Sequence, residues 1–267
     1  QEKDRSAEIW HGKRLGAEAA LARFSLDEAF ELHELEEALL ASIQGQDNVY
    51  FSLGHNKAHD TLFTEALTTL RDAPKESLAP GAVYDLCPIL HEMRLFKSAC
   101  EVAMMKAAGE ISARAHKRAM QFASPGCFEY QLEAEIHHEF AMAGARSPAY
   151  STIVGSGDNA CILHYTQNNG QINDGDLILI DAGAEYQGYA ADITRTFPAN
   201  GKFTHAQREI YSLVLKAQKS VLDMLAPGVT LSQAMLHSAE IITQGLVDLA
   251  VLEGSVAENL ENESWRH

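Results

Sequence analysis

Two acidic residues, Asp181 and Asp192, stand eleven positions apart in the segment Leu177–Phe197. An apolar run leads into Asp181 and a β-prone run follows Asp192, so we expect a hairpin that turns near Gln187-Gly188. The two acids then fall nearly opposite each other on one face of the hairpin. Cross-strand partners of this kind have Cβ atoms about 4.5–5.5 Å apart.

Carboxylates at that separation repel each other unless a proton or a cation lies between them. A pair of divalent ions roughly 3.5–4 Å apart would fit such a gap, and hard oxygen ligands favour manganese or magnesium. The same spacing is also typical of a simpler arrangement, in which Asp-Ala-Gly forms a turn and Asp192 caps a sheet edge. Two acids alone leave both interpretations open.

A glycine-rich segment and a histidine precede these acids. Residues 155–160 read Gly-Ser-Gly-Asp-Asn-Ala and imitate a dinucleotide fingerprint, which needs a helix directly after its glycines. The next residues, Cys161–Tyr165, predict a strand instead, so we reject a nucleotide cofactor. His164 stands in this predicted strand, where a lone histidine is more often a structural residue than a ligand.

Start and stop signals for helices frame these segments. Capping boxes, in which Ser or Thr is followed three residues later by Glu or Gln, predict helices after Ser25, Ser98, Thr204 and Thr230. Pro-Gly pairs at 125–126 and 227–228 predict where the second and third of these helices end. We also expect helices over 58–70, ended by Pro74, and over 129–143. The expected strands are 49–53, 150–154, 161–165, 176–181 and 191–197.

The order helix, Pro-Gly, helix occurs twice, which predicts a pseudo-symmetric domain. Several strands follow the first copy, whereas Gly245–His267 after the second copy contains no convincing strand pair, so we expect the second copy to be cut short. Prolines and a glycine gathered between residues 74 and 88 predict a domain boundary. We therefore expect a small α/β domain over 1–88 and a second domain over 89–267.

Composition narrows the classes of function. The net charge of −16, from 21 basic and 37 acidic residues, argues against a nucleic-acid partner, because such binding depends on clustered Lys and Arg. No apolar run approaches the roughly 18 residues that a membrane span needs. Four cysteines without a CxxC pair predict a reduced, cytoplasmic protein. The first residue, Gln1, is not methionine, from which we expect an internal fragment of a longer chain.

Several motifs together resemble the aminopeptidase P branch of the pita-bread, or creatinase/prolidase, family. They are His91–Lys97 with the helix after it, Thr152–Gly157, Ile162–Tyr165 and the hairpin Leu177–Phe197. The resemblance runs over essentially the whole chain and is less distinctive in the first 85 residues. It implies an α/β (α+β) fold, with a small N-terminal α/β domain followed by an incomplete pita-bread domain that carries a pseudo-twofold repeat.

The resemblance also implies an activity and a site. The family's enzymes remove an N-terminal residue that precedes proline, using two manganese ions (Mn2+) per intact chain and a hydroxide that bridges them. Asp181 matches the acid that chelates one metal, and Asp192 matches the acid that bridges both. His164 matches the histidine that binds substrate and stabilises the scissile carbonyl, and Tyr150 matches a tyrosine near the active site. The resemblance further suggests a homo-oligomer.

The family's other metal ligands are a histidine and two glutamates, which would lie beyond His267. We therefore expect this chain by itself to be inactive and to bind manganese weakly. The chain should also leave the apolar face of Leu177–Ile180 incompletely covered. Two alternatives stay open: a prolidase that cleaves only dipeptides ending in proline, and a non-catalytic pita-bread protein used for binding.

Overall fold

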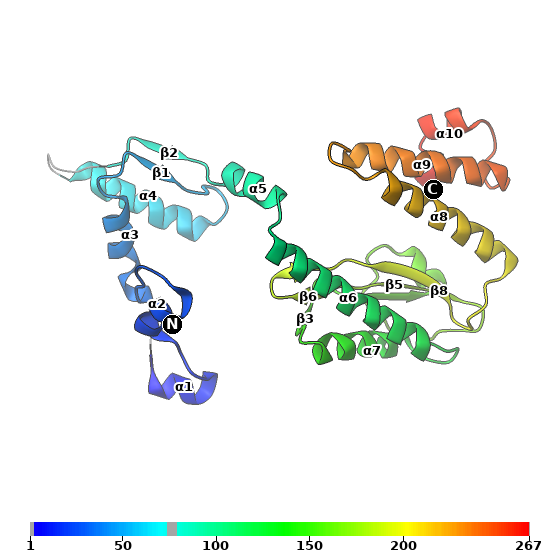
Figure 1. Cartoon of the computed structure of the whole chain (residues 1–267), viewed down its shortest axis with the longest axis horizontal. Helices are drawn as coiled ribbons and strands as arrows, with labels where there is room; N and C mark the ends of the chain where they lie inside the picture. The colour runs from blue at the N-terminus through cyan, green and yellow to red at the C-terminus, as the bar shows by residue number, and fades with distance from the viewer. Residues whose placement is uncertain (1–2, 74–78, 267) are drawn as a thin grey trace. The chain divides into compact units, whose positions relative to one another are not determined.

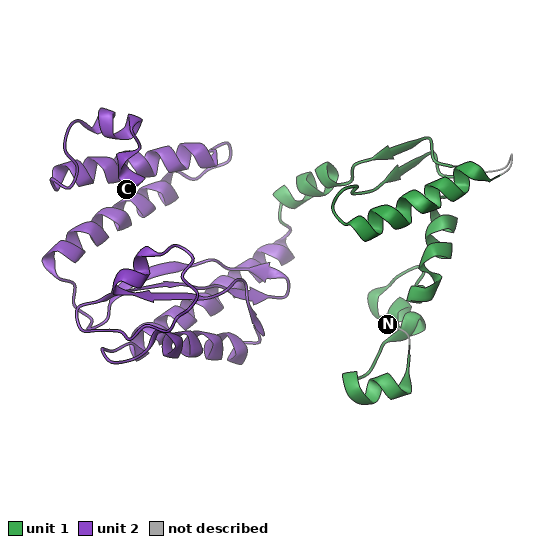
Figure 2. Ribbon diagram, turned by 180° about the vertical axis from the view of Figure 1, so that it is seen from behind, with its two compact units in different colours: residues 1–97 green, residues 98–267 purple. Residues whose placement is uncertain are grey.

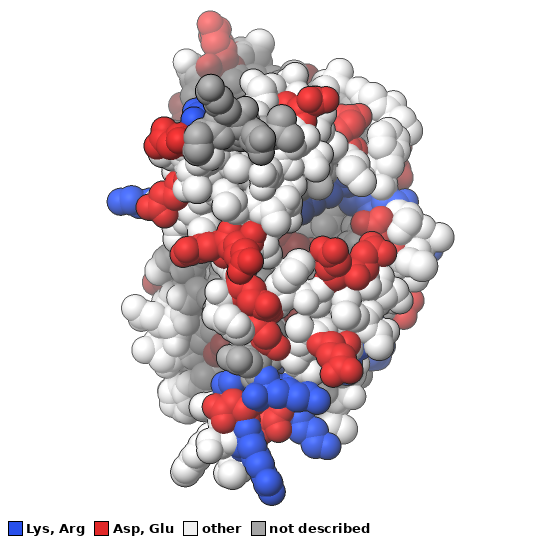
Figure 3. Space-filling model, turned by 90° about the vertical axis from the view of Figure 1, so that its left-hand side faces the viewer, with Lys and Arg blue, Asp and Glu red and all other residues white. Residues whose placement is uncertain are grey.

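The computed structural model describes residues 3–73 and 79–266, which form two compact units over residues 1–97 and 98–267 (Figure 2). Proline 74, the predicted end of a helix, lies outside the described residues. Within the part that the structure describes, no helix is both long enough and apolar enough to cross a membrane. Acidic side chains are spread over the face shown in Figure 3, and basic ones lie among them.

The first unit contains a short parallel β-pair connected by a helix (Figure 1). Its elements are α1 (Arg5–His11), α2 (Gly16–Phe24), a 3-10 turn (Leu32–Glu34), α3 (Leu35–Ile43), β1 (Asn48–Tyr50), α4 (Lys57–Asp72), β2 (Ala82–Tyr84) and α5 (Cys87–Leu95). Strands β1 and β2 pair from Asn48↔Ala82 to Tyr50↔Tyr84. The buried side chains of Ile43 and Phe63 join α3 and α4 into a small core.

The helix predicted to begin after Ser25 is wrong in its start. Ser25 has φ 51° and ends α2, so it cannot also open a helix. The capping box forms six residues later, where the backbone N–H of Glu31 donates to Glu34 Oε2 (2.7 Å). The apolar residues at helical spacing before that point are surface residues, with Leu26 49% and Phe30 54% exposed. The helical spacing of Leu26 and Phe30 therefore does not mark a buried helix face.

The second unit opens with two packed helices, α6 (Ala99–Phe122) and α7 (Glu129–Met142). The predicted capping box of α6 is confirmed, because Ser98 and Glu101 each accept a hydrogen bond from the other's backbone N–H. The fully buried side chains of Leu132 and Ile136 on α7 and of Ala115 and Ala119 on α6 belong to one hydrophobic core, which also contains the strand residues Ile178 and Ile180.

A second helix pair follows, α8 (His205–Met224) and α9 (Leu231–Asp248), which pack against each other as α6 and α7 do. The predicted capping boxes at Thr204 and Thr230 are confirmed. A further box at Ser255 opens α10 (Val256–Glu261), a helix that we did not predict, and a 3-10 turn (Ser264–Arg266) comes after it.

Two antiparallel three-stranded sheets lie between these helix pairs in the sequence. One sheet has the order β4 (Ile153–Ser156), β5 (Leu177–Asp181), β8 (Thr194–Pro198), and the other β3 (Ser147–Pro148), β6 (Ala184–Tyr186), β7 (Tyr189–Ala190). The turn between β6 and β7 falls at Gln187 (φ 50°) and Gly188 (φ 87°), the left-handed pair that a tight hairpin needs. The predicted position of the hairpin turn is therefore confirmed.

The two faces of β5 have different neighbours. Ile178 and Ile180 are fully buried with the side chains of α6 and α7. Leu177 and Leu179 point the other way and are only partly covered, since side chains alternate along a strand. Together with residues of β8 and α8 they line an apolar groove of about 710 Å³. The face expected to be incompletely covered is therefore the Leu177 and Leu179 face alone.

Candidate metal centre and active site

The register of the β5–β8 pair places Asp181 and Asp192 diagonally rather than opposite each other. Asp181 pairs directly with Thr194, so the predicted register was wrong by two residues. A shift of two keeps both acids on one face. The chain passes very close to itself just beyond β5, because a Cβ on Gly183 would lie 1.7 Å from the carbonyl oxygen of Ala191. Only glycine fits at that crossing, which sets the path from one acid to the other.

Tyr150 joins the two acids. Its hydroxyl donates to Asp181 Oδ1 (2.5 Å) and lies 3.3 Å from Asp192 Oδ1. Asp181 and Tyr150 are half-buried and Asp192 is exposed. Burial, the hydrogen bond to Asp181 and the negative charge of both acids raise the pKa of Tyr150 far above its ordinary value. The phenol is protonated at neutral pH, as an ordinary tyrosine is, and serves as a donor between two carboxylates.

The side chains of Tyr150, His164, Asp181 and Asp192 line the same hollow, which measures about 450 Å³. Its other lining residues are Ser151, Ile153 and Thr166. The structure thus brings together all four residues that the sequence singled out. Ser151 and Thr166 were missed, and an isolated Ser or Thr between two sheet segments carries no sequence signal of its own.

Two local predictions about these residues were wrong. His164 lies in an exposed turn rather than a strand, because residues 157–161 form a 3-10 helix and the chain turns after it. Tyr150 lies in the connection between β3 and β4 and not in a strand. The apolar residues Ile162 and Leu163 misled the prediction, since they are 54% and 89% exposed.

The donor set suits a hard divalent cation but is incomplete. Asp181 and Asp192 offer only carboxylate oxygens, which is the chemistry that magnesium and manganese prefer. Among the residues that the structure describes, no group of three or more His, Cys, Asp or Glu side chains could hold a metal ion. The two acids therefore fit as part of a ligand set, with the Tyr150 hydroxyl reducing the repulsion between them.

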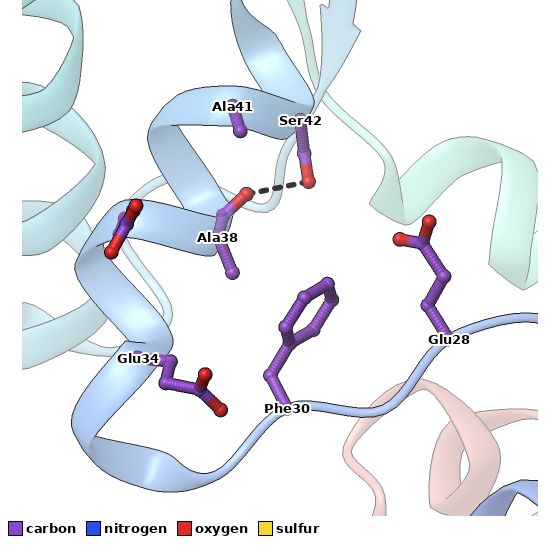
Figure 4. Close-up of a pocket in the computed structure, with 7 residues that line it drawn as sticks. Glu28, Phe30, Glu34, Ala38, Ala41 and Ser42 are labelled. Atoms are coloured by element: carbon purple, nitrogen blue, oxygen red, sulfur yellow. Dashed lines mark hydrogen bonds between the residues drawn. The ribbon is translucent and has the colours of Figure 1, made fainter.

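A second hollow, in the first unit, is also acidic but lacks this chemistry. Figure 4 shows Glu28 and Glu34 around the ring of Phe30, in a space of about 440 Å³ that Glu37 also lines. The hydroxyl of Ser42 there donates to the carbonyl oxygen of Ala38 (2.7 Å), as a helical serine commonly does. Its lining contains no histidine, so the hollow beside Asp181 is the stronger candidate for catalysis.

Comparison with known proteins identifies the class. Residues 103–260 match the sequence profile of metallopeptidase family M24, which is more than half of the chain. Residues 1–50 match the aminopeptidase P N-terminal domain. The chain therefore belongs to metallopeptidase family M24, and its mixed helix and sheet architecture, a small N-terminal domain followed by a pita-bread domain, is confirmed.

Individual relatives confirm the resemblance to aminopeptidase P. The chain is 49% identical over 265 residues to the Xaa-Pro aminopeptidase of Escherichia coli (strain K12), covering 99% of this chain and 60% of the relative. It is 32% identical to human Xaa-Pro aminopeptidase 3, covering 96% of this chain and 50% of the relative.

The structural relatives agree. A variant of Escherichia coli aminopeptidase P in complex with substrate superposes with a TM-score of 0.95 at 48% identity, covering 99% of this chain and 60% of that one. A zinc-substituted form of the same enzyme in complex with product is equally similar, again at a TM-score of 0.95. The chain thus spans about 60% of the length of the bacterial relatives that it matches.

Proposed function

We propose that the protein is a metal-dependent aminopeptidase that hydrolyses the bond between an N-terminal residue and a following proline. One observation carries this proposal: the Tyr150 hydroxyl hydrogen bonds to both Asp181 and Asp192, in a hollow that His164 also lines. Two carboxylates beside a histidine supply part of a metal-ligand set and a hydrogen-bond donor, as a metallopeptidase site needs. Similarity to Xaa-Pro aminopeptidases supports the choice of substrate.

The acids and the histidine have different roles in this proposal. Asp181 and Asp192 would hold divalent ions, for which we propose two manganese ions. Such ions, when bound, lower the pKa of water and polarise a peptide carbonyl. His164 would donate a hydrogen bond to the carbonyl oxygen of the scissile bond as negative charge develops there, a contribution of about 3 kcal/mol in comparable sites.

Tyr150 has a supporting role. Its protonated hydroxyl holds the two carboxylates in place and reduces the repulsion between them. Since the pKa of Tyr150 lies above its ordinary value, the phenol keeps this role beyond the neutral range and into alkaline pH. We propose that Tyr150 lines the substrate site from this position.

The test is hydrolysis of a peptide that begins Ala-Pro by the full gene product loaded with manganese. Release of free alanine from a tripeptide supports the aminopeptidase. Cleavage of the Ala-Pro dipeptide but not of the tripeptide would assign a prolidase instead. No turnover of either peptide, with no manganese bound, would favour a non-catalytic binding protein. A His164→Ala variant should lose most of its turnover while keeping its manganese.

Two further features concern the location and the assembly of the protein. We propose a cytoplasmic location, because the four cysteines suit a reducing compartment. We also propose a homo-oligomer, in line with the family resemblance. Fractionation of the native cell and light scattering of the purified protein test these two points.

A further inference from the structure

A buried carboxylate lies beneath the loop that carries His164. Glu129, the first residue of α7, is 0% exposed. Five hydrogen bonds converge on its carboxylate, and every one is donated to it. Burying a charge is costly unless it is fully paired, so such an arrangement indicates a specific structural task.

The five donor groups belong to Ser156, the last residue of β4, and to the loop that follows it. Glu129 Oε1 accepts from the backbone N–H of Ser156 (2.8 Å), from the hydroxyl of Ser156 (2.8 Å) and from Asn159 Nδ2 (3.1 Å). Glu129 Oε2 accepts from the hydroxyl of Tyr165 (2.7 Å) and from the backbone N–H of Gly170 (2.8 Å). One side chain therefore ties the end of β4 to residues 159, 165 and 170 of the loop.

His164 lies between these attachment points and directly before Tyr165 in the chain. His164 itself is exposed, whereas Tyr165 is only 7% exposed. Gly170 permits the close approach, because a Cβ there would lie 2.9 Å from both carboxylate oxygens of Glu129. A second attachment holds the neighbouring stretch, where the buried Asn168 bonds to the backbone of β4 through Val154.

We propose that Glu129 is the positioning residue that holds His164 at the candidate active site. The effect on catalysis rests on the proposed function, whereas the effect on the loop does not. Burial alone would raise the pKa of Glu129, but the hydrogen bonds from Tyr165, Asn159, Gly170 and Ser156 outweigh it and lower the pKa below its ordinary value. Glu129 therefore stays ionised and acts only as an acceptor at neutral pH.

Glu129→Gln is a sharp perturbation of this arrangement. The backbone N–H of Ser156 faces one oxygen and that of Gly170 faces the other, and neither group can accept a hydrogen bond. Whichever way the new amide is turned, its NH2 group points at one of these donors. Glu133→Gln is the matched control, because Glu133 lies on the same helix and takes no part in these five bonds.

The first measurement is hydrogen exchange of the full gene product, followed by mass spectrometry of peptides covering residues 157–165. We expect faster exchange in Glu129→Gln and unchanged exchange in Glu133→Gln. Unchanged exchange in a folded Glu129→Gln protein would overturn the proposal. If that variant does not fold, Tyr165→Phe removes one of the five donors to Glu129, together with the contacts of the same hydroxyl to Asn159 and Asn169. It should also speed exchange over residues 157–165, and unchanged exchange there would equally overturn the proposal.

The second measurement is a double-mutant cycle on Ala-Pro peptide hydrolysis. A displacement of about 1 Å at a reacting group can cost on the order of 100-fold, so Glu129→Gln should lower kcat at least tenfold. In a His164→Ala background the same change should cost less than about twofold, because Glu129 then has no histidine to position. Equal losses of kcat in both backgrounds would show that Glu129 has only a general structural role and would overturn the proposal. If the wild type shows no turnover, the proposed function fails, and the hydrogen-exchange experiment still tests whether Glu129 holds the loop that carries His164.

Discussion

Replacing Tyr150 by Phe removes one oxygen atom from between two carboxylates. The lost contacts are the 2.5 Å bond to Asp181 and the 3.3 Å bond to Asp192. A hydrogen bond to a charged group contributes about 1.5–3 kcal/mol, and only the shorter bond, to the half-buried Asp181, should contribute fully. We therefore expect a loss of about 2 kcal/mol in the free energy of unfolding without metal, which lowers Tm by roughly 4–8 °C.

Metal should offset this loss. A divalent cation held by Asp181 and Asp192 would neutralise their negative charge, whereas the neutral Tyr150 hydroxyl only offsets part of their repulsion through its hydrogen bonds. Manganese should therefore raise the Tm of Tyr150→Phe more than that of the wild type. The assay is thermal unfolding of the full gene product, first with a chelator and then with saturating manganese. Tyr130→Phe is the control, because Tyr130 is 50% exposed and its hydroxyl bonds to neither acid. An equal Tm for Tyr150→Phe and wild type in the chelator would refute the reasoning.

Four further substitutions test other parts of the structure by thermal unfolding. Gly183→Ala should destabilise the protein by about 3 kcal/mol or more, since its Cβ would lie 1.7 Å from the Ala191 carbonyl oxygen. Gly109→Ala, in the open middle of α6, should instead stabilise it by about 0.5–1 kcal/mol. A greater loss of stability in Gly109→Ala than in Gly183→Ala would contradict the close crossing of the chain at Gly183. Because the pKa of Glu129 is lowered in the folded protein, its contribution is complete above the ordinary pKa of about 4.3 and is lost as pH falls through the lower folded value. The Tm difference between wild type and Glu129→Gln should therefore be large at pH 7 and shrink below about pH 4. A difference that stays constant with pH would contradict the ionised state of Glu129. Ser98→Ala should cost about 1 kcal/mol through loss of the α6 cap, and no cost would show that the cap is redundant.

The features that the sequence predicted correctly depend on neighbouring residues. The box that opens α6 needs only Ser98 and Glu101, which exchange two hydrogen bonds across one turn. The hairpin turn needs two residues with positive φ, and Gln187-Gly188 supplies them. These two signals are complete within a few residues, whereas the same kind of box at Ser25 failed because that residue ends α2.

The errors arise where distant residues decide the local structure. The register between Asp181 and Asp192 depends on how closely the chain can cross at Gly183, which the spacing of the acids does not reveal. The turn that carries His164 is held by Glu129, which in the sequence looks like an ordinary acid in the first turn of a helix. The candidate site was thus predictable in its residues, whereas the geometry that brings them together was not.

The central claim is that Asp181 and Asp192 hold the metal ions of the active site. Its most direct test is the manganese content of the full gene product after removal of free metal, measured for the wild type, for Asp192→Asn and for the exposed control Asp158→Asn. We predict two ions per chain in the wild type and in the control, and a large loss in Asp192→Asn. Equal manganese in all three proteins would contradict the claim.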